Sequence, residues 1–116
     1  MSRPEKYYAR TADTRRVYPL QMAVGEAYPV EIDWGQMVGE YGSSVQDCSW
    51  QTDSGVVGIA DADVDGSVTR ATVSAVTDGV GMVVAVVTLT DDRVFSRWWY
   101  VRVTDPAAGA VTDYPS

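Results

Sequence analysis

The chain contains no histidine at all. Histidine is the commonest general base in enzymes, the usual partner of a nucleophilic serine or cysteine, and the commonest metal ligand. A Ser–His–Asp or Cys–His catalytic arrangement is therefore impossible, whatever the fold. Glycine-rich phosphate-binding motifs and the GxSxG motif of hydrolases are absent as well. These absences predict a protein that is not an enzyme and that uses no cofactor.

Cysteine is scarce, and long hydrophobic runs are missing. Cys48 is the only cysteine, so the chain cannot form an internal disulfide or a thiolate metal cluster, and we interpret this residue as a small buried hydrophobe. No apolar run approaches the roughly 20 residues that cross a bilayer. The polar start, Met1–Lys6, lacks the hydrophobic segment of a signal peptide. We expect a soluble protein made in the cytoplasm.

Positive charge is scarce outside the first residues. Residues 1–16 carry five basic and two acidic side chains, a net charge of +3. Residues 17–116 carry four basic and fourteen acidic ones, a net charge of −10, so the net charge of the chain is −7. An acidic body repels phosphate backbones, so nucleic acid is not an expected partner. The basic start predicts either an arm that docks on an acidic neighbour, such as another copy of the chain, or a solvated and frayed terminus.

The rest of the sequence consists of short β-rich runs separated by Gly, Asp and Ser, without helical periodicity over ten or more residues. Only residues 34–38 suggest one helical turn, capped by Asp33. About seven strands with turns at this spacing predict an all-β, immunoglobulin-like β-sandwich, with a small barrel as the alternative. We divide the chain into an extended N-terminal arm (1–27), the β-sandwich domain (28–104) and a short C-terminal tail (105–116).

The two runs with the strongest β pattern, 82–90 and 94–103, form a hairpin. If its turn holds two or four residues, one face forms the core and the opposite face, which should meet water, is apolar and aromatic. The outward side chains are then Met82, Val84, Val86, Phe95, Arg97 and Trp99. Aromatic residues and arginine are typical anchors of interfaces, so we interpret this face as a binding surface. A three-residue turn would change the register, although some apolar residues would still point outward.

The end of the arm has a pattern of its own. Alternate residues from Tyr18 to Val24 are apolar, which predicts an extended segment that lays one face on an apolar surface. The interface that we expect on the arm comprises Arg15, Arg16, Tyr18, Leu20 and Met22. The alternative is that residues 17–24 fold back over the apolar hairpin face of the same molecule.

An acidic run, Asp61-Ala62-Asp63-Val64-Asp65-Gly66, matches the first half of a calcium-binding loop. Its alternating carboxylates offer oxygen ligands to a hard cation, but Thr72 stands where such a loop needs a bidentate glutamate. Asp61, Asp63 and Asp65 are therefore only a weak calcium candidate. An acidic β-turn, in which Asp and Gly supply the turn geometry, explains the same residues, and we expect no bound metal.

Several motifs, in their order and spacing, resemble one family. They are Val30-Glu31-Ile32-Asp33-Trp34, Val45 to Trp50, Asp78-Gly79-Val80-Gly81, Val83 to Thr90, Asp91-Asp92-Arg93 and Val101-Arg102-Val103. Over residues 28–104 the chain resembles small immunoglobulin-like virion proteins of tailed bacteriophages, of the fibre-to-tail adaptor or tail-connector type. It departs from them where Val80 interrupts the turn glycines and in its long basic arm.

The resemblance implies a structural virion protein that is assembled in the host cytoplasm. It would form a homo-oligomeric ring and join the tail or portal complex to tail fibres through protein–protein contacts. The resemblance implies no catalytic residues. The lack of a long apolar run predicts that a membrane is not a partner. Two other functions stay open: a capsid decoration (cement) protein held by the arm, and a carbohydrate-binding module that presents aromatic side chains to sugars.

Overall fold

A computed structural model of the chain describes residues 5–9, 17–52 and 55–105. Arg15 and Arg16 of the expected interface, and the expected tail from residue 106 onward, lie outside these residues. Within the described part, the only helix has seven residues, and none is long and apolar enough to cross a membrane.

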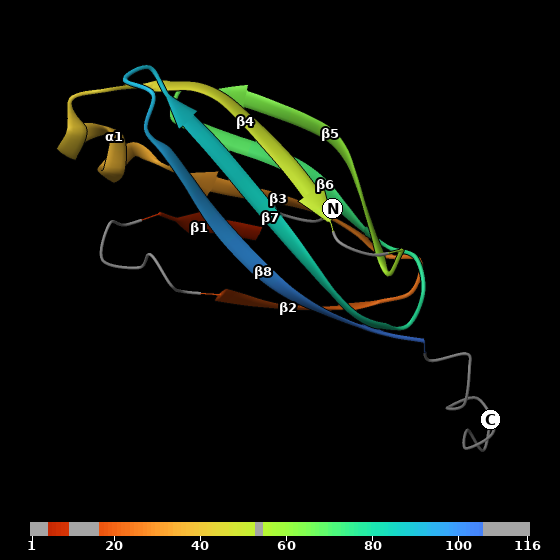
Figure 1. Cartoon of the computed structure of the whole chain (residues 1–116). Helices are drawn as coiled ribbons and strands as arrows, with labels where there is room; N and C mark the ends of the chain where they lie inside the picture. Colours follow the sequence, from red (N-terminus) through yellow and green to blue (C-terminus); the bar gives the residue numbers. More distant parts are fainter. Residues whose placement is uncertain (1–4, 10–16, 53–54, 106–116) are drawn as a thin grey trace, which may run out of the picture.

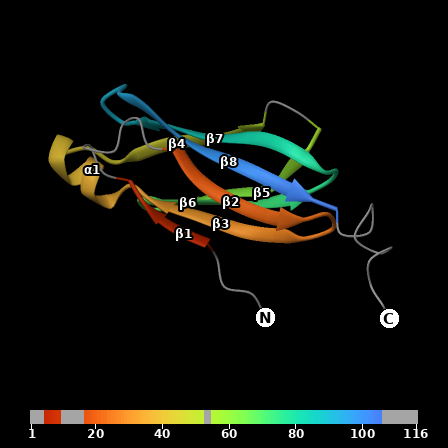
Figure 2. The ribbon, with the colours of Figure 1, turned by 90° about the horizontal axis from the view of Figure 1, so that it is seen from below.

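The described residues form two four-stranded sheets packed face to face, with a short helix at one end (Figures 1 and 2). The first sheet has the order β1 (Glu5–Tyr8), β3 (Ala27–Asp33), β6 (Val68–Ala75), β5 (Val57–Asp65), and the second has the order β2 (Val17–Ala23), β8 (Val94–Thr104), β7 (Gly79–Leu89), β4 (Val45–Thr52). The helix, α1 (Gly35–Tyr41), connects β3 to β4. The predicted immunoglobulin-like β-sandwich is confirmed.

Two segments of the expected arm are strands of the sandwich. β1 runs parallel to β3 in the first sheet, and β2 runs parallel to β8 in the second. Tyr18, Leu20 and Met22 alternate with exposed residues and point into the core, where each is at most 5% exposed. The apolar face that the sequence predicted for this segment therefore packs against the chain's own interior. Pro19 has no amide hydrogen to give to a ladder, which is compatible with a strand at a sheet edge.

The turn between β7 and β8 contains three residues, 90–92. The Leu89 amide donates to the Arg93 carbonyl at 2.8 Å, and the Asp92 amide donates to the Leu89 carbonyl at 3.0 Å. Asp92 has the left-handed φ of 71° that the last position of such a turn requires. Asp tolerates this conformation better than most residues because its short side chain can bond locally.

This turn corrects the expected hairpin register. Val83 lies opposite Trp99 and Val84 opposite Trp98, so Phe95, Arg97 and Trp99 face inward while Trp98 and Tyr100 face outward. The expected outward direction is right for the β7 side chains and wrong for those of β8. A turn of two or four residues was assumed, and a turn of three shifts the partner strand by one residue, which exchanges its two faces.

The core at the helix end is organised around Trp34, the residue that follows β3. Its indole Nε1–H donates to the Thr69 Oγ1 at 3.0 Å, and both residues are fully buried. The Trp34 amide also donates to the Ser67 carbonyl at 2.8 Å. A buried indole requires such an acceptor, so β6 fixes where β3 ends and where α1 begins.

We expect Thr69→Val to lower the free energy of unfolding by about 1–3 kcal/mol, because it keeps the side-chain shape but leaves a buried indole N–H without its acceptor. Urea denaturation followed by circular dichroism measures the change. Thr72→Val is the matched control, since Thr72 lies on the outer face of the same strand, and its effect should stay within about 0.5 kcal/mol. Equal effects of the two substitutions would contradict the assigned role of Thr69.

Candidate functional site

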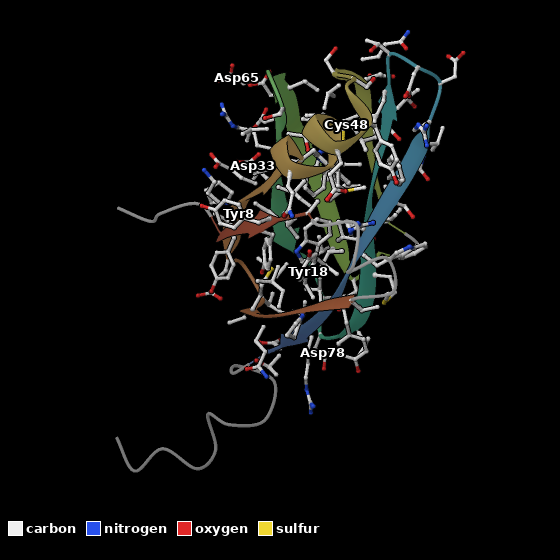
Figure 3. All side chains as sticks on the ribbon, turned by 90° about the vertical axis from the view of Figure 1, so that its left-hand side faces the viewer. Tyr8, Tyr18, Asp33, Cys48, Asp65 and Asp78 are labelled. Carbon is white, nitrogen blue, oxygen red and sulfur yellow. The ribbon has the colours of Figure 1, made fainter. Side chains whose placement is uncertain are left out.

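Among the described residues, three chain connections meet at the end of the sandwich that carries α1. They are the segment 34–44 with α1, the β5–β6 turn around Gly66, and the β7–β8 turn. We call this group the helical end. Figure 3 looks onto it and shows α1 between the turn that carries Asp65 and the β7–β8 turn. Binding residues of a sandwich are generally found on such loop clusters, because a rigid scaffold holds them in place.

The start and stop of α1 follow from local chemistry. The Asp33 carboxylate accepts from the Gly35 amide at 2.8 Å and from the Ser67 hydroxyl at 3.4 Å. A Cβ on Gly35 would lie 2.9 Å from that same carboxylate oxygen, so a larger residue would disturb this contact. Gly42 ends the helix in the left-handed conformation, with φ 59°. The expected single turn is thus the first part of a seven-residue helix.

A buried arginine supports α1 from below. Arg97 of β8 is only 2% exposed. Its Nη2 donates to the Met37 sulfur at 3.3 Å, its Nη1 donates to the Ser96 carbonyl at 2.7 Å, and its guanidinium lies 5.7 Å from the centre of a Trp34 ring. Met37 and Trp34 are themselves buried. Arg97 therefore supports the inner face of α1, and its charge is not exposed on the surface where another protein could bind.

The β7–β8 turn is fastened to the chain that leaves α1. The Ser43 and Thr90 hydroxyls are 2.9 Å apart, and the Thr90 amide donates to the Ser44 carbonyl at 2.9 Å. The Arg93 guanidinium lies 4.2 Å from the centre of the Tyr41 ring. Tyr41 also stacks on Phe95, with ring centres 5.5 Å apart. These contacts join α1 and the turn into one rigid surface.

The outward side of the helical end is polar and acidic. The exposed side chains include Gln36, Glu40, Asp65, Asp91 and Asp92. Arg93 offsets part of this charge, because its Nε lies 2.9 Å from an Asp91 carboxylate oxygen. An acidic, preorganised surface suits a protein partner whose own surface is basic, since opposite charge speeds the encounter.

The structure gives little support to the calcium candidate. Arg70 lies within ion-pair distance of Asp63 (3.4 Å), Asp65 (3.6 Å) and Glu31 (3.5 Å). Asp61 belongs to a β-bulge and has a left-handed φ of 55°. In the described part of the chain, no group of three acidic or cysteine side chains is arranged to hold a metal ion. A guanidinium therefore occupies the place that a cation would take beside Asp63 and Asp65.

The Cys48 thiol lies partly buried on the inner side of β4, between the two sheets. Burial raises the pKa of this thiol, a hydrogen bond with Thr69 opposes that effect, and the charge of Asp47 adds to it. The thiolate is the reactive form of cysteine. The sequence predicted a buried residue, and the structure places Cys48 half-buried against the core. Its raised pKa makes the thiol less reactive than an exposed one.

The remaining residues of the expected interface divide between two places. Phe95 is half-buried beneath Tyr41, whereas Met82, Val84 and Val86 face outward on β7. Sequence reasoning missed Trp98 and Tyr100 as outward residues. The signal that would have found them is the triplet Thr90-Asp91-Asp92, read as a complete three-residue turn.

Comparisons with known proteins give a fold and no family. No protein-family model and no curated protein matches the sequence. Among solved structures, the chain is similar to the cysteine protease inhibitor EhICP2 from Entamoeba histolytica, with a TM-score of 0.52 and 5% identity over 90% of this chain and 100% of that one. It is also similar to PbICP-C in complex with falcipain-2, with a TM-score of 0.50 and 10% identity over 86% of this chain and 99% of that one.

These similarities contradict the expected membership of the phage virion family. Of the two structures, one is a cysteine protease inhibitor and the other is a complex with falcipain-2, and neither is described as a virion protein. The expected tail adaptor function, the tail, portal and fibre partners in a homo-oligomeric ring, and the virion location were wrong. The motifs did not identify the family because their residues have structural roles in the fold. Asp33 bonds to the Gly35 amide at the start of α1, and Trp34 fills the core. EhICP2 is described as an inhibitor and not as an enzyme, in agreement with the expected lack of catalysis.

We expect Cys48 to react slowly with a disulfide reagent such as DTNB in the folded protein, and much faster in concentrated guanidinium chloride, because burial keeps the thiol protonated and covered. A pKa that is raised on folding also stabilises the fold below the ordinary value of about 8.5, and this contribution is lost as the pH rises above it.

The control for this pH effect is Cys48→Ala. Between neutral and alkaline pH, the free energy of unfolding of the original chain should fall more than that of the Cys48→Ala variant, because only the original chain carries the thiol. The burial of Cys48 would be contradicted if the two proteins kept a constant difference in this free energy and DTNB labelled the folded protein rapidly.

Proposed function

We propose that this chain is a protein inhibitor of cysteine proteases and binds them through the helical end. The observation that carries the proposal is the architecture shared with the cysteine protease inhibitor EhICP2 and with PbICP-C, which was solved in complex with falcipain-2. The similarity extends over nearly the whole length of both chains in each comparison. At this level of identity the similarity establishes the fold alone, so the binding end has to be argued from this chain's own geometry.

The helical end favours tight binding because it is already ordered. Arg97 supports α1 from the core, Ser43 and Thr90 connect it to the β7–β8 turn, and Trp34 connects it to β6. A surface that is rigid before binding loses little conformational entropy when it meets a partner.

The backbone of the helical end is also a poor substrate. Proteolytic nicking concentrates at exposed and flexible loop tips. Here the backbone is a helix, or a three-residue turn with ladder bonds on both sides. Neither can enter a catalytic cleft as an extended chain without breaking those hydrogen bonds. A protease that binds this end is therefore blocked without cleaving it.

The test is inhibition of papain and of a cathepsin in an assay with a fluorogenic peptide substrate. We expect inhibition that increases with the concentration of the chain, no inhibition of the serine protease trypsin, and no cleavage of the chain by papain on a gel. Absence of inhibition of both cysteine proteases, with a folded chain, would contradict the proposed function.

A matched pair of glycine substitutions locates the binding end. A Cβ on Gly39 of α1 or on Gly55 of the β4–β5 connection meets nothing within 4 Å, so arginine fits at either position without strain. The two residues lie at opposite ends of the sandwich. Gly39→Arg places a long side chain in front of the helical end and should raise the inhibition constant roughly 30-fold or more, the effect of a lost hot spot. Gly55→Arg should leave inhibition unchanged.

A further inference from the structure

The outer face of the sheet β2-β8-β7-β4 is unusually apolar. Among the described residues, eight large hydrophobic side chains are well exposed, and five of them lie on this face: Val17, Val80, Val94, Trp98 and Tyr100. Trp98 is 41% exposed and Tyr100 44%. Single exposed hydrophobic residues are ordinary on protein surfaces, but a cluster of this kind indicates a contact surface.

The cluster is continuous across three strands. Trp98 lies between Val17 of β2 and Val84 of β7, and Tyr100 lies between Pro19 and Met82 in the next row. Val84 is 9% exposed although it is outside the core cluster, because its neighbours on the outer face cover it. Two large aromatic side chains in the middle of an apolar area are the usual arrangement of interface anchors.

Charge is nearly absent from this face. Of the described residues that point outward on the four strands, only Arg102 and Asp47 are charged. Arg102 lies opposite Val80 at one end of the face, and Asp47 lies opposite Thr88 at the other end. The outer face of the other sheet differs, because Lys6, Glu31, Asp63, Asp65 and Arg70 form an ion-pair network there.

We propose that this outer face binds a second copy of the chain, with the two sheets packed face to face about a two-fold axis that crosses the strands. Such an axis exchanges the two ends of the face, so Trp98 and Tyr100 of one copy lie near the same residues of the other copy. Arg102 of one copy then lies at the end that holds the partner's Asp47. The surface is complementary to itself in polarity and charge, as an isologous contact requires.

The area is sufficient for a pair. The four strands β2, β8, β7 and β4 have 7, 11, 11 and 8 residues, and each residue covers about 3.3 Å along its strand and about 4.8 Å across it. The face therefore measures roughly 590 Å² per copy, or roughly 1,200 Å² for the pair, at the lower limit of a standard interface. A two-fold pair closes on itself, so it is not the ring that the comparisons contradict. It also leaves the helical end free and does not depend on the proposed function.

The test is analytical ultracentrifugation of the full chain over a range of concentrations at physiological ionic strength. Salt at this level screens the repulsion between two copies of net charge −7. We expect a reversible change from the mass of one chain, 12.6 kDa, to twice that mass. Trp98→Glu should raise the dimer dissociation constant roughly 30-fold or more, because it places a carboxylate in the apolar centre.

Two further sets of variants keep the test decisive. Val80→Glu and Val76→Glu replace valines of similar exposure, 47% and 57%, and only the first, on the outer face, should weaken the dimer. Arg102→Asp and Asp47→Arg should each weaken it about 2- to 5-fold, the range of an exposed ion pair, and the double variant should recover the original affinity. Circular dichroism confirms that each variant is folded.

Three outcomes would overturn the proposal. The first is that the unmodified chain stays monomeric at every concentration up to the millimolar range. The second is that the folded Trp98→Glu and Val80→Glu variants dimerise as well as the unmodified chain, and the third is that the charge-exchanged double variant dimerises no more tightly than its single variants. Inhibition of papain is measured on the same samples, so loss of dimerisation and loss of inhibition are distinguished.

Discussion

The three-residue turn between β7 and β8 determines the arrangement of the second sheet. Because Asp92 takes the left-handed conformation, Val83 pairs with Trp99, and every side chain of β8 has its direction fixed. Trp99 then stacks on Trp50, with ring centres 5.2 Å apart, and meets Tyr18 at 5.4 Å in the core. A turn one residue shorter or longer would place Trp98 and Tyr100 inside and Arg97 outside. The core, the support of α1 and the outer face all follow from this register.

The helix α1 depends on both sheets. At its start, Trp34 bonds to Thr69 of the first sheet. In its middle, Met37 rests on Arg97 of the second sheet. After its end, Ser43 and Ser44 bond to Thr90 of the hairpin. A seven-residue helix has little stability of its own in water, so tertiary contacts at its start, middle and end account for its presence.

Some of these features could be predicted from the sequence, and others could not. The alternation of β7 indicated correctly that Met82, Val84 and Val86 share one face, and the turn signals indicated a β-sandwich. Both faces of β8 carry two aromatic residues, so local pattern could not decide between them, and an aspartate in a left-handed position is a weaker turn signal than glycine. For Tyr18, Leu20 and Met22 the pattern revealed an apolar face but not its partner. That partner is set by parallel pairing with a strand about 80 residues away, for which local sequence carries no signal.

The β7–β8 hairpin belongs to both proposed surfaces. Arg93 packs on Tyr41 at the helical end, and the next residue, Val94, begins the exposed apolar row of the outer face. A second copy on the outer face contacts the flank of this hairpin but leaves the exposed side of α1, with Gln36 and Glu40, open. Arg93 and Val94 are neighbours in the chain, but Arg93 packs on Tyr41 whereas Val94 lies on the outer face. The two surfaces are therefore adjacent on one hairpin without sharing exposed residues, so dimerisation and binding at the helical end are separable properties of the same chain.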